Sequence, residues 1–185
     1  MVHTELLANL VIKYNIYKFY GNIFIRGENM KIKNFIIEDF VNYKKPSLFI
    51  SMPKCTFKCE KDCGIKCCQN SNLVKAKTIE IRIQTLINIF DSNTINQAIV
   101  FGGLEPFDSF EDLQLFIEAF RFTHNNDIVI YTGYNEDEII SKVNKLIKYG
   151  NIIIKYGRFI PNQESHYDEI LGVNLASSNQ YAKRY

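Results

Sequence analysis

Several features that would assign the chain to a common class are missing from its sequence. No run of apolar residues is long enough to cross a membrane. Residues 1–22 lack the basic start, long apolar stretch and small-residue cleavage site of a signal peptide. The net charge is only +2, with acidic and basic residues interspersed, which gives no electrostatic case for binding nucleic acid or a membrane surface. We therefore expect a cytoplasmic protein without nucleic-acid or membrane partners.

Cysteine is also absent from most of the chain, because all five cysteines lie in the segment CTFKCEKDCGIKCCQN, residues 55–70. Thiols stay reduced in the cytoplasm, and an odd number crowded into one loop argues against a disulfide framework. Metal or cluster binding is the better interpretation. Soft sulfur ligands suit zinc and iron–sulfur clusters alike, so the cysteines alone leave both open.

Elsewhere, short apolar runs alternate with segments whose apolar residues have helical spacing. The runs at 48–52, 96–103, 127–134 and 151–159 predict buried strands. Three helical faces lie between these strands. They comprise Ile83, Leu86, Ile87 and Phe90; Leu113, Phe116, Ile117 and Phe120; and Ile139, Ile140, Val143, Leu146 and Ile147. This alternation predicts an α/β domain with a mostly parallel sheet.

Unusual sequence follows each of three expected strands: the cysteine segment at 55–70, FGGLEPF at 101–107 and YTGY at 131–134. Ligands of parallel sheets bind beyond the carboxyl ends of the strands. We therefore expect these three loops to converge in space.

The order of these motifs resembles the radical S-adenosylmethionine (SAM) superfamily, and within it the small activating proteins of the anaerobic ribonucleotide reductase. The resemblance runs from about Met30 to the C-terminus. It includes YGRF at 156–159, which is similar to the Asp-Gly-x-Phe of those activases, and ASSNQ at 176–180, which is similar to their Gly-Ser-x-Asn-Gln. The fold that this resemblance implies is an incomplete (β/α) barrel with a mostly parallel sheet.

The resemblance also implies the chemistry. In that superfamily three thiolates hold a [4Fe–4S] cluster, and the open iron binds SAM, which is cleaved reductively to a 5′-deoxyadenosyl radical. The activases use this radical to make a glycyl radical on a partner enzyme, here the large subunit of an anaerobic ribonucleotide reductase. An electron donor such as flavodoxin or ferredoxin is also implied. Two alternatives stay open: a radical SAM enzyme acting on a small molecule or peptide, and a non-catalytic iron–sulfur or zinc module.

The cysteine spacing departs from the family pattern Cys-x3-Cys-x2-Cys-x-Asn. Cys55 and Cys59 keep the first interval, but Cys63 comes one residue late. The Cys-x-Asn ending reappears at Cys68 and Asn70. We expect Cys55 and Cys59 to be cluster ligands, with Cys68 favoured over Cys63 as the third.

The other implied site residues bind SAM: Gly102, Gly103, Glu105, Thr132, Gly133 and Tyr134. In the family the acid of the first motif binds the amino group of SAM, and glycines let the backbone approach it closely. The second motif lies on the adenosine side. Taken singly, each motif is also compatible with an ordinary turn at the end of a strand.

Residues 1–29 take no part in the resemblance, whereas 30–185 already matches the size of a complete activase. Residues 26–29 can be encoded by a purine-rich sequence of the ribosome-binding kind. We therefore expect translation to start at Met30, so that 1–29 is a mis-assigned extension. The alternative is a genuine extension that forms an edge strand.

Overall fold

The computed structural model describes residues 28–185 of the chain, and the expected extension lies mostly outside this range. A six-stranded sheet forms its centre, in the order β10-β7-β6-β5-β3-β2. These strands are β2 (Asn34–Asp39), β3 (Ser47–Ser51), β5 (Ala98–Gly102), β6 (Asp127–Tyr131), β7 (Ile152–Tyr156) and β10 (Tyr181–Arg184).

The four inner strands of the sheet are parallel to one another. Every residue of β5 and β7 is buried, as is typical of strands covered on both faces. The edge strands β2 and β10 run antiparallel to their neighbours. The expected mostly parallel α/β sheet is thus confirmed. In residues 28–185 the two edges do not pair with each other, and the incomplete barrel stays a prediction.

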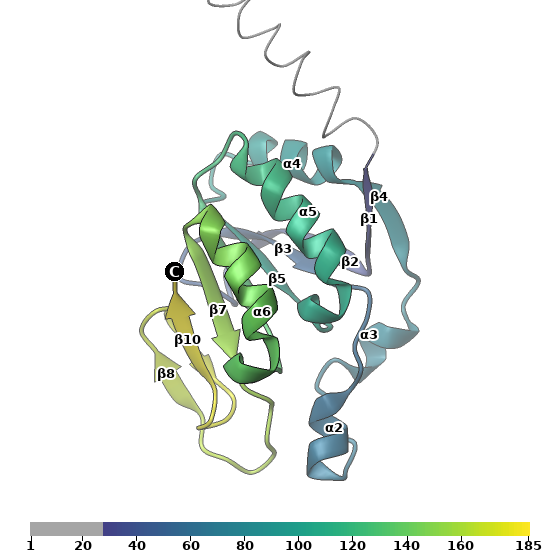
Figure 1. The fold of residues 1–185 in the computed structure, drawn as a ribbon, viewed down its shortest axis with the longest axis vertical. Coiled ribbons are helices and arrows are strands. Elements are labelled where there is room, and N and C mark those ends of the chain that lie inside the picture. The colour runs from purple at the N-terminus through teal and green to yellow at the C-terminus, as the bar shows by residue number, and fades with distance from the viewer. Residues whose placement is uncertain (1–27) are drawn as a thin grey trace, which may run out of the picture.

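Three helices cover one face of the sheet (Figure 1). They are α4 (Ile83–Ser92), α5 (Phe110–Arg121) and α6 (Glu136–Leu146), the last followed by the 3-10 turn η2 (Ile147–Tyr149). All the predicted apolar residues of α4 and α5 are buried. In α6 the prediction was wrong for Ile140, which is 45% exposed. It follows Ile139 by one residue, so the 100° helical rotation turns it away from the stripe that packs on the sheet.

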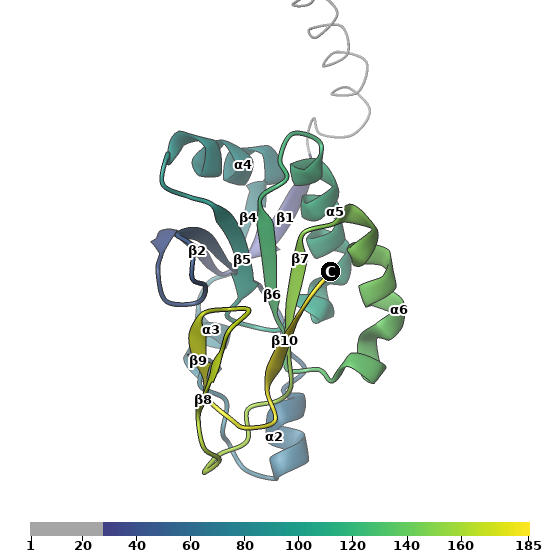
Figure 2. The ribbon, with the colours of Figure 1, turned by 90° about the vertical axis from the view of Figure 1, so that its left-hand side faces the viewer.

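The opposite face is covered by loops and a small hairpin (Figure 2). The hairpin pairs β8 (His166–Asp168) with β9 (Val173–Leu175). Buried Tyr43, Leu171 and Leu175 pack there against the inner residues of the sheet. A third, two-stranded sheet pairs β1 (Asn29–Ile32) with β4 (Ile79–Arg82), so the first strand within residues 28–185 includes the residue before Met30.

The cysteine segment projects beyond the carboxyl ends of the parallel strands (Figure 1). It contains the short helix α2 (Lys58–Cys63) and leads into α3 (Ser71–Lys75). A 3-10 turn, η1 (Pro106–Ser109), follows β5 at the same end. Within residues 28–185 no helix is both long enough and apolar enough to span a bilayer.

Candidate functional site

Glu105 is a buried carboxylate, 7% exposed, at the point where η1 begins. Its Oε1 accepts hydrogen bonds from the Thr132 hydroxyl (2.7 Å) and the Phe107 backbone N–H (3.1 Å), and its Oε2 accepts one from the Gly133 N–H (2.8 Å). Burial nevertheless raises the pKa of Glu105 to about 7. Across residues 28–185, no lysine, arginine or histidine forms an ion pair with it. A buried carboxylate without an ion pair is suited to accept a hydrogen bond from a ligand or to bind a cationic group of the ligand.

The three loops singled out in the sequence do converge at this site. The Glu105 N–H donates to the Lys54 carbonyl (2.8 Å), just before the cysteines. Asp108 joins the other two loops: it accepts from the Thr56 N–H (2.6 Å) and from the Tyr134 hydroxyl (2.6 Å). The carboxyl ends of β3, β5 and β6 therefore form one continuous polar site.

Two glycines allow this close approach. A Cβ on Gly133 would lie 3.1 Å from Cys59 Sγ and 3.6 Å from Glu105 Oε2, so only a bare backbone fits comfortably between the cysteine segment and the acid. Gly103 has a φ of +74°, and a Cβ there would lie 2.9 Å from Ser51 Cβ. This glycine is thus required by its left-handed backbone and by packing. Gly102 ends β5, beside the Phe49 ring.

Cys55 and Cys59 each interact electrostatically with Cys68. Burial raises the pKa of Cys55 to about 11, and it raises the pKa of Cys59 as well. Glu105 and Cys68 add to both shifts through charge repulsion. Because a cluster or metal binds thiolates, loading this loop must release protons.

Cys63 and Cys67 lie close together, with their sulfurs 3.0 Å apart, and Cys67 also interacts electrostatically with Cys59. The interactions of Cys68 with both Cys55 and Cys59 support these three as the ligand set, which stays a prediction. Nowhere in residues 28–185 are three or more histidine, cysteine, aspartate or glutamate side chains arranged tightly enough to hold a metal ion. If Cys55, Cys59 and Cys68 hold the cluster, their sulfurs would have to draw together.

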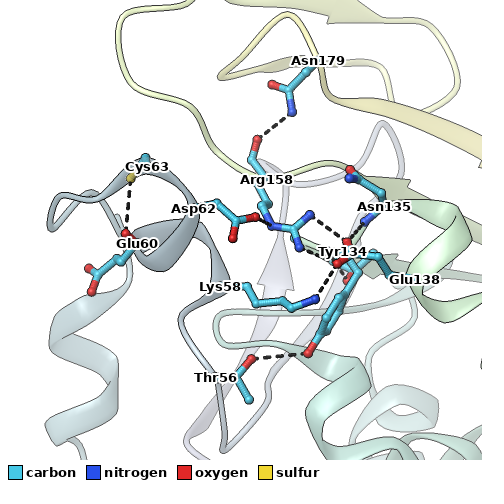
Figure 3. Close-up of polar contacts among 12 residues, drawn as sticks. Thr56, Lys58, Glu60, Asp62, Cys63, Tyr134, Asn135, Glu138, Arg158 and Asn179 are labelled. Carbon is cyan, nitrogen blue, oxygen red and sulfur yellow. Dashed lines mark hydrogen bonds and ion pairs between the residues drawn. The ribbon is translucent and has the colours of Figure 1, made fainter.

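A network of charges fastens α2 to the body of the domain (Figure 3). The guanidinium of Arg158, which follows β7, makes two bonds to the Glu138 carboxylate, of 2.6 and 2.7 Å. Its Nε lies 2.6 Å from Asp62 Oδ2 on α2, and Lys58 at the start of α2 also pairs with Glu138. These bonds hold the pKa of Glu138 at about 2. The helix between the cysteines is thus held by α6 and by the loop after β7.

Sequence reasoning missed Arg158, Glu138, Asp108 and Lys155. Lys155 is buried on β7, where its Nζ donates to the Gly157 carbonyl (2.9 Å). Burial lowers the pKa of Lys155 to about 8, while Glu105 and Cys59 act in the opposite direction. A signal was available, since a lysine inside the apolar run NIIIKYG is out of place in a buried strand.

The two late motifs lie against each other. Gly157 has a φ of +94°, and a Cβ there would lie 2.9 Å from the Asn179 carbonyl oxygen. The Asn179 side chain donates to the Arg158 carbonyl (3.0 Å; Figure 3), and the Gln180 side chain donates to the Gly157 carbonyl (3.2 Å). Their contacts in this structure support the loop that carries Arg158.

The donor set at this end of the sheet fits an iron–sulfur cluster, because soft cysteine sulfurs gather in one short loop at the ends of the strands. A protein-family model described as a 4Fe-4S single cluster domain matches residues 45–182. No curated protein and no solved structure gave a significant match. The family match spans the whole site, from the strand before the cysteines to β10. The chain therefore belongs to the 4Fe-4S single cluster domain family, whose members are iron–sulfur proteins.

Proposed function

We propose that this iron–sulfur protein is a radical SAM activase, which cleaves SAM reductively and generates a glycyl radical on a partner enzyme. The observation that carries the proposal is the position of Glu105. A buried carboxylate that forms no ion pair within residues 28–185 lies beside Cys59, with only the backbone of Gly133 between them. A site for the cluster alone has no need of this acid, whereas a site for SAM has.

Glu105 would accept hydrogen bonds from the amino group of SAM. Three donors already fix the carboxylate in orientation, so little conformational freedom is lost when a ligand binds. The predicted ligands Cys55, Cys59 and Cys68 would hold the cluster next to it. Thr132, Gly133 and Tyr134 continue from the same turn and would border the adenosine, while Gly102 and Gly103 shape the turn before the acid.

When bound, the cluster supplies the electron that cleaves the sulfonium of SAM. The chain's own contribution is to orient SAM and to exclude water from it. The charge network of Arg158 and Glu138 would hold α2 closed over the site. Lys155, buried near Glu105 and Cys59, adds a positive charge beneath the site.

The partner proposed is a glycyl-radical enzyme, by resemblance an anaerobic ribonucleotide reductase. The matched family segment occupies most of the described chain, and the sheet with its covering layers accounts for residues 28–185. No additional domain for a small substrate is present within that range, which favours a protein substrate. The electron donor would be a flavodoxin or ferredoxin.

The test is made without oxygen, on reconstituted protein with dithionite, SAM and the candidate reductase. The proposal predicts a glycyl-radical signal in electron paramagnetic resonance spectra of the reductase. It also predicts that Glu105→Gln loses the signal while keeping its cluster, because this variant removes the negative charge that would bind the SAM ammonium and leaves every cysteine in place.

Three other outcomes would favour the alternatives. Cleavage of SAM without a radical on the reductase would point to a small molecule or peptide as substrate. A fully loaded cluster that neither binds nor cleaves SAM would leave a non-catalytic iron–sulfur module. Tight binding of zinc in place of iron would turn the site into a structural one.

A further inference from the structure

Cys63 and Cys67 form a thiol pair that the proposed cluster site does not use. Their sulfurs lie 3.0 Å apart, which is about 1 Å longer than a disulfide bond. Both side chains are half-buried, so a small reagent can reach them. Cys55 and Cys59 interact electrostatically with Cys68, and Cys67 in turn interacts with Cys59.

The backbone brings the two thiols together. Helix α2 ends at Cys63, and Gly64 follows with a left-handed φ of +71° and no atom within 4 Å of the position where a Cβ would stand. This glycine reverses the chain, so that Cys67 returns over the last turn of the helix. The Gly64 N–H donates to the Glu60 carbonyl (2.9 Å) and fixes the reversal. Closing the pair therefore needs no rearrangement of the domain.

We propose that Cys63 and Cys67 are a reversible dithiol–disulfide site on the cluster loop, oxidised by a low-molecular-weight disulfide. This inference rests on the assignment of Cys68 as the third cluster ligand, but not on SAM cleavage. The Cys68 N–H donates to the Glu60 carboxylate (3.2 Å), so Cys68 and the pair share one support on α2. The disulfide would join Cys67, the neighbour of Cys68, to Cys63 at the end of α2.

The exchange balances in two steps. The Cys63 thiolate attacks one sulfur of the small disulfide and releases one small thiol. Cys67 then attacks the Cys63 sulfur of the mixed disulfide and releases the second. The protein loses two electrons and two thiol hydrogens, and the small disulfide gains both as it becomes two thiols.

The sequence provides a direct assay, because Lys66 lies between the two cysteines. Cluster-loaded full-length protein is equilibrated without oxygen in glutathione disulfide and glutathione mixtures, blocked with an alkylating reagent and digested with trypsin. A Cys63–Cys67 disulfide holds peptides 62–66 and 67–75 together until a reductant is added. A bond between Cys67 and Cys68 would instead stay inside one peptide.

The proposal predicts the linked peptides while the visible absorbance of the cluster is retained. Cys67→Ser should abolish the link and keep the cluster, and Cys68→Ser should keep the link. Three results would overturn it: no link in any mixture, a link that survives Cys67→Ser but not Cys68→Ser, or a link that appears only when the cluster is lost. The third result would identify Cys63 as a cluster ligand and would leave the proposal of SAM cleavage unaffected.

Discussion

At the scale of single residues, the pKa values of two glutamates of the site shift in opposite directions, because burial dominates at Glu105 and ion pairs dominate at Glu138. Glu138 faces Arg158 and Lys58, and its pKa is lowered to about 2. Glu105 is buried with neutral donors only, and its pKa is raised to about 7. The first carboxylate stabilises the fold when charged, whereas the second is held charged at a cost.

Glu105 should therefore make the fold less stable as the pH rises. Between pH 4.5 and about 7 the folded protein keeps the proton that the unfolded chain has lost, so the free energy of unfolding falls across this window and is level above it. The total effect is about 3 kcal/mol. Urea unfolding of the wild type and of Glu105→Gln, both without SAM, measures the difference. Parallel pH profiles would contradict the raised pKa.

Gly133→Ala should weaken cluster binding, since the new methyl would lie 3.1 Å from Cys59 Sγ. We expect a lower iron content and a weaker cluster absorbance at unchanged secondary structure. Gly102→Ala is the matched control, because its methyl would meet the Phe49 ring at 3.1 Å and no sulfur. Equal cluster content in both variants would show that the approach of Gly133 to Cys59 is unimportant.

Individual site residues could be predicted where a motif carried them, as for Glu105, Thr132 and Gly133, which lie together as expected. Arg158 and Asp108 could not. Their roles depend on which side chains from distant segments come within hydrogen-bond distance, and no local pattern of charges encodes this.

At the scale of elements, α2 is a helix of only six residues without a buried side chain of its own. Helices this short are not stable alone. Its position depends on the contacts of Lys58 and Asp62 with Glu138 and Arg158 (Figure 3). The cysteine segment thus owes its order to charges supplied by α6 and by the loop after β7.

Glu138→Gln should loosen α2 more than it weakens the fold. We expect faster amide hydrogen exchange across 58–63 and a loss of about 1–2 kcal/mol in the free energy of unfolding, as for a charged hydrogen-bonded partner. Glu136→Gln is the matched control, because Glu136 in the same helix pairs with Lys183 on β10 instead. Equal changes in the amide hydrogen exchange of α2 in both variants would contradict the role of Glu138 in holding this helix.

The helices and strands themselves were largely predictable, because α4 and α5 carry clear apolar periodicity and the inner strands are short continuous apolar runs. Ile140 was mispredicted because it is apolar and directly follows Ile139, so residue type alone did not separate it from the buried face of the helix. The hairpin of β8 and β9 was not foreseen, since strands of three residues leave too short a pattern.

At the scale of the whole molecule, the parallel order of β3, β5, β6 and β7 explains why motifs far apart in sequence meet at one end. The sequence predicted this convergence through the general rule for parallel sheets. It did not predict that Cys63 and Cys67 lie side by side, because their approach depends on how the loop folds after α2.

The most direct test of the account measures 5′-deoxyadenosine after anaerobic incubation of the reconstituted protein with dithionite and SAM. The account predicts product from the wild type and from Cys63→Ala, and none from Cys68→Ala or Glu105→Gln. A wild-type protein that holds a complete [4Fe–4S] cluster and forms no 5′-deoxyadenosine would contradict the central claim.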